Sequence, residues 1–434
     1  MTKKLPAALL AAALLFTALP LGAHAGEAPG ASPFAFNGGM DREVLRNYAA
    51  RAVTYAGLCA EGTAPDPYFE DGLRMICAAG AKFIGRAAYY DWSGSMTAEQ
   101  IEAHYRLAEE RAAQAHAADP ELILQAGVFE IVYQGTADSI AIPPWVFKAF
   151  HLPVQKRNFR YDWIRWFSWD EKTTGFWSSA DPSAVPCVAR LETQMYFYWK
   201  ICRYIDAGYE AFHLGQAELM AGGCKLNALG WLRILHLARI YAKTHARRGV
   251  VLFDAHLNRV DFMKLGCRLL LDLHGAPLYP QETREEDGAL MAALVHNRDD
   301  GRKHIGRRTG GRHPLGFTVD TQFTIYEFDN WDGNNGQPGV VSPEDIHCWG
   351  YDDITWFALQ PAWYRDRFLR ECGAFFKQAG PDAQGGQVHF LQPPMRRVVQ
   401  GAPGIYEYRA NNPSAACPNG FGQEDTIREL FLGF

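Results

Sequence analysis

The sequence predicts an α/β protein that folds as a (β/α)8 TIM barrel, with long loops after its strands and a small β-rich cap at its carboxyl end. Two observations lead to this prediction. From about Arg51 onward, short apolar runs alternate with longer segments of helical period, a pattern typical of parallel strands joined by helices. Eight such units follow one another, which is the number that closes a (β/α)8 barrel.

Short apolar runs mark the expected strands. In chain order, they are residues 52–58, 81–88, 122–132, 209–214, 249–254, 268–273, a segment within 316–328, and 353–359. Runs of this length, rich in Val, Ile, Leu and Phe, favour the buried strands of a parallel sheet.

Segments of helical period fill the spaces between these strands. They are expected at residues 69–79, 97–117, 188–207, 227–246 and 363–377, with a last helix at 425–432. Thr97 and Gln100 have the spacing of a capping box at the start of one helix. Gly80 follows another helix, where glycine is the common residue for ending a helix.

The loop after the third strand departs from this alternation. It spans residues 134–183 and carries five tryptophans, at 145, 163, 166, 169 and 177. A loop of this length inside a compact domain usually serves a function. The whole chain has 12 Trp, and its aromatic residues make up 13% of the composition. We expect most of these rings to fill the core and some to stack on the apolar faces of sugars.

The amino end has the pattern of a signal peptide over residues 1–25. Lys3 and Lys4 precede an apolar run from Leu9 to Leu21, and Ala23-His24-Ala25 places small residues at both cleavage positions. We therefore expect export to the periplasm or the extracellular space. No run is long and apolar enough to span a bilayer.

The remaining chain is expected to form one large domain. Residues 26–50 lead into the barrel at 51–380, and residues 381–434 form an extension with short strands at 388–391, 395–399 and 404–408. About 50 residues make only a marginal core alone, so we expect this extension to pack on the barrel.

Charge and cysteine usage exclude several classes of function. The net charge is −5 and the charges are interspersed, so nucleic acid is not an expected partner. The nine cysteines form no CxxC pair, which argues against a zinc site or a disulfide scaffold. No cofactor is expected, and the oligomeric state is left open.

Polar residues gather where the expected strands end, which is the face that carries the chemistry in a (β/α)8 barrel. These residues are Glu61, Arg86, Asp91, Glu130, Glu218, Asp254, His256, Asp272, His274, Tyr279, Glu282, Glu327, Asp329 and Trp356.

Glu218 and Glu327 are the expected catalytic pair. Glycoside hydrolysis needs one protonated and one ionised carboxyl on either side of a glycosidic bond. The two glutamates follow strands four and seven, which face each other across a barrel mouth. The sequence therefore predicts a glycoside hydrolase that acts on an oligo- or polysaccharide. The residues expected to bind substrate are Arg86, Glu130, Asp254, His256, His274, Tyr279, Asp329 and Trp356.

With these two glutamates, the barrel at about 51–377 resembles the large clan of retaining glycoside hydrolases with (β/α)8 barrels. The resemblance implies that Glu218 is the general acid/base and Glu327 the nucleophile. It also implies that Arg86 holds Glu327 ionised by its charge. One position departs from the clan, because Ala217 stands where an Asn usually precedes the acid/base; Gln216 or Asn258 could replace that contact.

The resemblance extends to three further residues. His274 and Tyr279 match a His and a Tyr that commonly follow strand six in the clan. Trp356 matches a Trp that is common at strand eight.

Two other functions are left open by the residues. The pairs Asp254/His256 and Asp272/His274 repeat the pattern Asp-x-His, and together they could bind a divalent metal in a metal-dependent hydrolase. A barrel that binds glycans without cutting them would use the same aromatic loop. The stretch 329–335 has oxygen ligands that suit calcium, although a plain polar loop is the simpler interpretation.

Overall fold

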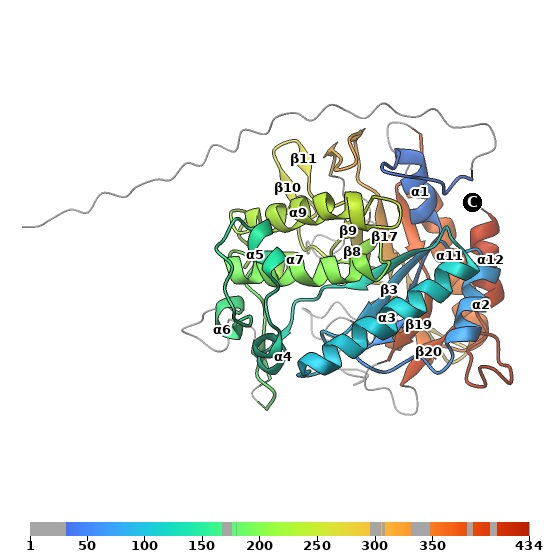
Figure 1. Ribbon diagram of the computed structural model, residues 1–434. Coiled ribbons are helices and arrows are strands. Elements are labelled where there is room, and N and C mark those ends of the chain that lie inside the picture. The colour runs from blue at the N-terminus through green and yellow to red at the C-terminus, as the bar shows by residue number, and fades with distance from the viewer. Residues whose placement is uncertain are drawn as a thin grey trace, which may run out of the picture. The chain divides into compact units, whose positions relative to one another are not determined.

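The computed structural model describes residues 32–166, 180–295, 305, 309–330, 348–379, 385–399 and 406–433, and the backbone of 176–178. The chain divides into two units, Met1–Ser32 and Pro33–Phe434. The expected signal peptide lies outside the described residues. Every helix and strand named below belongs to the second unit (Figure 1).

The central feature is a set of parallel strands in two sheets, one from β19 through β1 to β9 and one from β12 to β18. The strands are β1 Ala52–Tyr55, β3 Phe83–Tyr89, β4 Ile123–Gly127, β8 Ala211–His213, β9 Leu252–Asp254, β12 His274–Pro277, β17 Thr324–Glu327, β18 His389–Gln392 and β19 Pro394–Val398. Each pairs in parallel with the next through β9, and β12 pairs with β17 and β17 with β18. An isolated parallel bridge, His256 to Gly275, joins the β9 and β12 segments. β19, which follows β18 after Pro393 alone, pairs in parallel with β1.

Two of the expected strands are wrong. Residues 353–359 form helix α10 (Asp353–Leu359), which Asp352 caps by accepting a hydrogen bond from the Thr355 backbone N–H. The place between β17 and β1 belongs to β18 and β19, whose residues the sequence predicts for the cap. Residues 268–273 contain only the short β11, and the central strand begins later, at His274. A short apolar run does not by itself distinguish a strand from a buried helix or fix its boundaries, which explains both errors.

The other six strand predictions overlap the observed strands, and the expected helices are present. They are α2 Phe69–Ala79, α3 Ala98–Ala118, α7 Leu191–Asp206, α9 Leu229–His245, α11 Ala362–Gln378 and α12 Glu424–Leu432. Thr97 and Gln100 make both bonds of the predicted capping box. Gly80 ends α2 with a φ of 74°, a conformation that favours glycine. Helices α7 and α9 pack against each other and lie side by side in Figure 1.

Shorter elements make up the loops and the remaining sheets. The helices are α1 Arg42–Ala50, α4 Gln134–Ser139, α5 Pro144–Ala149, α6 Tyr161–Ile164 and α8 Ala217–Met220. The strands are β2 Ala60–Glu61, β5 Val132–Tyr133, β6 Phe176–Ser178, β7 Ser183–Ala184, β10 Lys264–Leu265, β11 Arg268–Leu269, β13 Gln281–Glu286, β14 Ala289–Ala293, β15 Gly311–Arg312, β16 Thr318–Val319 and β20 Glu407–Arg409.

Alternation along the central strands sorts their side chains into two clusters. One set, which includes Val53, Ile84, Leu124, Phe212 and Phe253, belongs to the large core that also contains the apolar faces of the helices. The neighbouring positions form a second core together with Leu45 and Tyr48 of α1; its strand members include Ala52, Phe83, Ile123, Ala211, Leu252, Leu273, Ile325 and Phe390.

The second core is apolar only at the amino-terminal ends of the strands. Two residues further along each strand, on the same face, the chain has Thr54, Gly85, Gln125, His213, Asp254, Gly275, Glu327 and Gln392. This layer is polar, and it includes several residues that are hydrogen-bonded to one another. The alternation therefore places a buried polar layer at the carboxyl ends of the strands.

Candidate active site

Glu327 lies at the centre of this polar layer and is almost fully buried. Its Oε1 accepts hydrogen bonds from Arg86 Nη2 at 2.6 Å and from His256 Nε2 at 2.9 Å. Its Oε2 accepts from Thr54 Oγ1 at 3.1 Å and from Arg397 Nη1 at 3.2 Å. Burial favours the neutral acid, but Arg86 and His256 outweigh it and lower the pKa of Glu327 to about 2. Glu327 is therefore an ionised carboxylate at neutral pH.

Arg86 reaches Glu327 because its backbone is unusual. Its φ is 59°, and the register between β3 and β4 shifts between Ile84 and Ala88. A non-glycine residue rarely adopts this conformation, which is found more often at functional sites. The Arg86 backbone N–H donates to Gln125 Oε1 at 3.1 Å, which holds the turn in place.

Asp329 is a second carboxylate that shares the same cations. Its Oδ1 accepts from Arg397 Nη2 at 3.0 Å and from Arg86 Nη1 at 3.3 Å. The two arginines thus each bridge Glu327 and Asp329. Such a fork-like arrangement holds both carboxylates in one orientation.

His213 and Asp254 form a buried pair beside this cluster. His213 Nδ1 lies 2.7 Å from Asp254 Oδ2, and Asp254 Oδ1 accepts from Gln125 Nε2. Burial raises the pKa of Asp254 to about 8 and lowers the pKa of His213 well below its usual range. A Cβ on Gly275 would lie 2.7 Å from Asp254 Oδ2, so only glycine fits closely against this pair.

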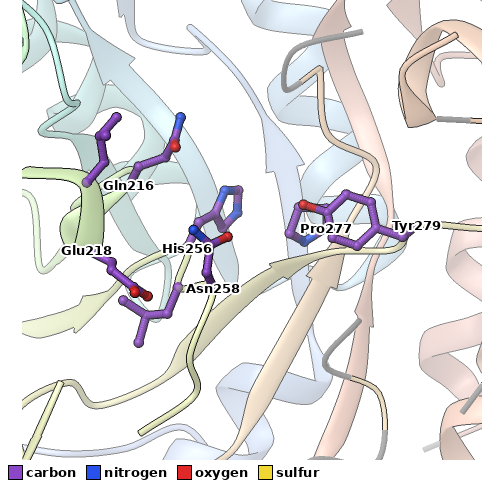
Figure 2. A pocket seen from close by; sticks show the side chains of 8 residues that line it. Gln216, Glu218, His256, Asn258, Pro277 and Tyr279 are labelled. Carbon is purple, nitrogen blue, oxygen red and sulfur yellow. The ribbon is translucent and has the colours of Figure 1, made fainter. Parts of the chain in front are cut away.

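His256 connects the buried cluster to a pocket at the surface of the protein. The residues that line this pocket are Gln216, Glu218, Leu219, His256, Leu257, Asn258, Pro277 and Tyr279. In the view of Figure 2, His256 lies between Glu218 on one side and Tyr279 on the other. The pocket opens where β8, β9 and β12 end, so the structure brings together three residues of the predicted site, Glu218, His256 and Tyr279.

Glu218 lies in helix α8 just after β8 and is paired with a cation. Its Oε1 accepts from Arg259 Nε at 2.7 Å and its Oε2 from the Arg259 backbone N–H at 3.0 Å. Arg259 Nη2 also donates to the carbonyl oxygen of Gly223 at 2.6 Å. The Arg259 side chain is 47% exposed, so solvent reaches this ion pair.

Glu130 is buried next to the pocket and is bonded to Gln216. Its Oε2 accepts from the Gln216 backbone N–H at 3.0 Å, and its Oε1 from Gln216 Nε2 at 3.3 Å. Burial raises the pKa of Glu130. Gly215 has a φ of 53°, and a Cβ at this position would overlap Glu130 Oε2. Glu130 therefore orients a residue of the pocket wall.

Two predicted site residues lie elsewhere. Trp356 belongs to α10 and is fully buried, where its Nε1 donates to the carbonyl oxygen of Leu290 at 2.7 Å. His274 begins β12 instead of following the sixth strand, because this strand starts six residues later than expected. Its partner across the ladder is Thr324, at the start of β17, whereas Glu327 ends that strand. The positions expected for Trp356 and His274 are therefore wrong.

The two Asp-x-His pairs do not converge on one metal site. Asp254 bonds to His213, whereas Asp272 Oδ2 accepts from Arg239 Nη2 at 2.7 Å and from the Phe253 backbone N–H at 2.9 Å. Among the described residues, His213, His256 and Glu327 have ligand atoms within 4.8 Å of one another. Arg86 Nη2 lies 2.6 Å from Glu327 Oε1 and 3.3 Å from His213 Nε2, so a cation already fills this space and the residues do not fit a metal ion.

The described part of the aromatic loop shows packed rings and one exposed ring. Trp145 packs against Tyr198 and Tyr241, and Trp163 is 45% exposed with the Arg160 guanidinium 4.2 Å from its centroid. The side chains of Trp169 and Trp177 and most of the stretch 329–335 lie outside the described residues.

Sequence reasoning missed Thr54, Gln125, His213 and Arg397. A signal existed for two of them. His213 interrupts the apolar run Phe212-His213-Leu214, and Arg397 stands in a strand that the sequence predicts for the cap. A charged residue in a buried strand is rare unless it is paired, so Arg397 itself argued for a place near carboxylates.

No family model and no curated protein matches the sequence. Several solved structures to which the chain is similar are glycoside hydrolases. They include a debranching enzyme of Nostoc punctiforme (9% identity, 89% of this chain and 80% of that chain, TM-score 0.44). A GH113 β-1,4-mannanase is another (9% identity, 89% of this chain and 99% of that chain, TM-score 0.43). The chain covers only 50% of a maltogenic α-amylase from Thermotoga neapolitana (10% identity, 53% of this chain, TM-score 0.33).

Proposed function

We propose that this chain hydrolyses glycosidic bonds in an oligo- or polysaccharide. The observation that carries the proposal is Glu327, an ionised carboxylate held by four donors at the carboxyl ends of the central strands, beside a pocket that presents a second carboxyl, Glu218. Two carboxyls on either side of one bond are the requirement of this chemistry. We also infer that the ring of strand pairings is a closed (β/α)8 barrel, the fold in which such groups meet at one face.

Within this proposal, Glu327 is the nucleophile and Glu218 the general acid/base. Glu327 attacks the anomeric carbon as the glycosidic bond breaks, and the leaving oxygen takes a proton from Glu218. The ionised Glu218 then activates the water that releases the sugar. Without substrate, the Glu218 carboxylate is paired with Arg259. This ion pair must therefore break when Glu218 takes up a proton. Arg86 and Arg397 keep Glu327 ionised.

The pocket residues provide contacts for sugar hydroxyl groups. Gln216 and Asn258 both line the pocket and carry amides that can donate and accept hydrogen bonds. Tyr279 has a φ of 44°, and its backbone N–H donates to Asp353 Oδ2 at 3.1 Å. We propose that these three side chains bind the substrate.

Export belongs to the same proposal. Residues 1–25 have the composition of a cleaved signal peptide, and a polysaccharide hydrolase meets its substrate outside the cytoplasm. None of the helices in the described part of the chain has the length and hydropathy to cross a membrane. Mass spectrometry of the protein recovered from an expressing bacterium tests the expected cleavage before Gly26.

The experiment that tests the activity is a screen of plant, host and microbial glycans for released reducing ends. Glu327→Gln is expected to abolish turnover while the Kd for the same glycan, measured by calorimetry, stays within about threefold, since the change removes charge and little volume. Glu218→Gln is expected to lower kcat by about 10² to 10⁴ for substrates with poor leaving groups. The matched control, Glu285→Gln, changes an exposed glutamate in β13 and is expected to keep full activity.

The outcomes separate the proposal from its alternatives. Binding of a glycan without turnover by the wild-type chain contradicts hydrolysis and indicates a glycan-binding protein. The configuration of the first product, followed by NMR, distinguishes retention from inversion. Inversion would overturn the nucleophile role of Glu327 and leave hydrolysis intact.

A further inference from the structure

We propose that His256 is a positioning residue of this site: its ring is held between Glu327 and Asp329, and it fixes the Glu327 carboxylate relative to the pocket. The inference rests on the proposed function for its kinetic consequences. The position and protonation of the ring are argued from its contacts alone.

The His256 ring bridges the two carboxylates. Nε2 lies 2.9 Å from Glu327 Oε1, and Nδ1 lies 3.4 Å from Asp329 Oδ2. Ionised carboxylates only accept hydrogen bonds, so Nε2 must carry a proton to make its bond to Glu327. The Asp329 carboxylate lies at ion-pair distance from Nδ1, so its charge favours a second proton on the ring, the imidazolium form.

The surroundings of His256 fix the ring from several sides. Its backbone N–H donates to the carbonyl oxygen of Gly215 at 2.9 Å, and its backbone bridges to Gly275. The ring packs edge-on against His213, with the centroids 4.7 Å apart. Because these contacts come from β8 and β12 as well as from the β9 segment, the ring orientation does not depend on one loop.

The charged groups that face His256 favour its protonated form. Burial and the Arg86 charge oppose protonation, but Asp329 and Glu327 outweigh them and raise the pKa of His256. The titratable and charged groups around the ring are Arg86, Glu130, His213, Asp254, Glu327 and Asp329. His213 is neutral at neutral pH, so it adds no charge that would repel the imidazolium.

His256 differs from the other donors to Glu327 in where it lies. Arg86, Arg397 and Thr54 also hold this carboxylate, but of the four donors only His256 is among the described residues that line the pocket. His256 therefore links the buried nucleophile to the wall of the pocket. Loss of the Nε2 bond should leave substrate binding almost unchanged and misplace the nucleophile, which lowers kcat and not KM.

Two variants separate the Nε2 hydrogen bond of the ring from the Nδ1 contact with Asp329. Gln places an amide nitrogen near the position of Nε2 and can still donate to Glu327, whereas the shorter Asn reaches only the position of Nδ1. We expect His256→Asn to lower kcat by about 100-fold and His256→Gln by no more than about tenfold, with KM within about threefold in both. The matched control is His245→Gln, at an exposed histidine of α9, which is expected to keep the kcat of the wild type.

Imidazole ¹⁵N chemical shifts of His256 give a readout that does not need activity. We expect two protonated nitrogens at neutral pH in the wild type, and a neutral ring at the same pH in the Glu327→Gln/Asp329→Asn double variant. A neutral ring in the wild type, or equal kcat losses in the Asn and Gln variants with circular dichroism unchanged, overturns the inference. Absence of turnover on every glycan, with the imidazolium signal present, contradicts the proposed function and leaves the geometry of His256 standing.

Discussion

Arg86 Nη2 lies 2.6 Å from Glu327 Oε1, although 241 residues separate them along the chain. The contact joins β3 to β17, and it brings the charge of a buried arginine to a buried carboxylate. Breaking a buried ion pair by removing one partner is costly because the other charge stays behind. The pair therefore governs both the ionisation of Glu327 and the stability of the polar layer.

Replacing Arg86 should move the acid limb of the pH profile. Glu327 has a folded-state pKa lowered to about 2, so its stabilising contribution is present above its ordinary pKa and is lost as pH falls towards 2. Without the Arg86 charge, the pKa of Glu327 rises, and kcat/KM of Arg86→Met should begin to fall at a higher pH than in the wild type. We also expect a loss of about 3–5 kcal/mol in unfolding free energy.

Arg86→Lys serves as the comparison for this prediction, because it keeps the charge and loses the fork that reaches both Glu327 and Asp329. Its acid limb should lie nearer that of the wild type. Identical acid limbs in all three proteins would contradict the assigned role of Arg86. Kinetics across pH and urea denaturation provide the two measurements.

Gly215→Ala should disturb the pocket wall. The residue has a φ of 53°, and the added Cβ would overlap Glu130 Oε2, which holds Gln216. Gly266→Ala is a matched control, since Gly266 has a φ of 58° and open space around its Cβ position. Both variants place an alanine at a positive φ. The difference between their unfolding free energies therefore measures the overlap of the added Cβ with Glu130. We expect Gly215→Ala to be less stable than the control by about 1–3 kcal/mol in denaturant unfolding, with a raised KM.

Asp254→Asn should flatten the pH dependence of stability. Asp254 has a folded-state pKa of about 8, so between its ordinary pKa and 8 the folded state holds a proton that the unfolded state releases. The wild type therefore loses stability from this group as pH rises, by up to about 1.4 kcal/mol per pH unit. Asn mimics the protonated acid and cannot titrate.

Denaturant unfolding from about pH 5 to about pH 8 measures this slope. The exposed Asp287 gives the control variant Asp287→Asn, whose slope should equal that of the wild type. If Asp254→Asn shows the same slope as the control, Asp254 is ionised in the folded protein and the neutral pair with His213 is wrong.

Trp356→Phe should affect stability and not catalysis. The indole is fully buried in α10, packs edge-on against Phe368 with centroids 4.9 Å apart, and donates to the carbonyl oxygen of Leu290. We expect a loss of about 1–3 kcal/mol in unfolding free energy, because the Leu290 carbonyl is left without this donor. Steady-state kinetics should give kcat and KM equal to those of the wild type. A changed KM would indicate that Trp356 contributes to substrate binding.

The elements that depend on local rules could be predicted from the sequence. The capping box of Thr97 and Gln100, the Gly80 end of α2 and the period of α9 are set by residues a few positions apart. Six strands were found near their apolar runs for the same reason. Arg86, Glu218 and Glu327 could be singled out because each follows or ends such a run.

Only the tertiary structure decided which segment pairs with β1 and which side chains meet. The runs at 353–359 and 389–398 both suit a strand by composition, and only the second pairs with both β17 and β1. That choice brings Arg397 to Glu327, and the start of β12 at His274 moves this residue away from the site. The physical reason is that strand register and the choice of strand partner depend on contacts between residues hundreds of positions apart. Helix caps and the alternation of apolar and polar residues depend on neighbours in the chain.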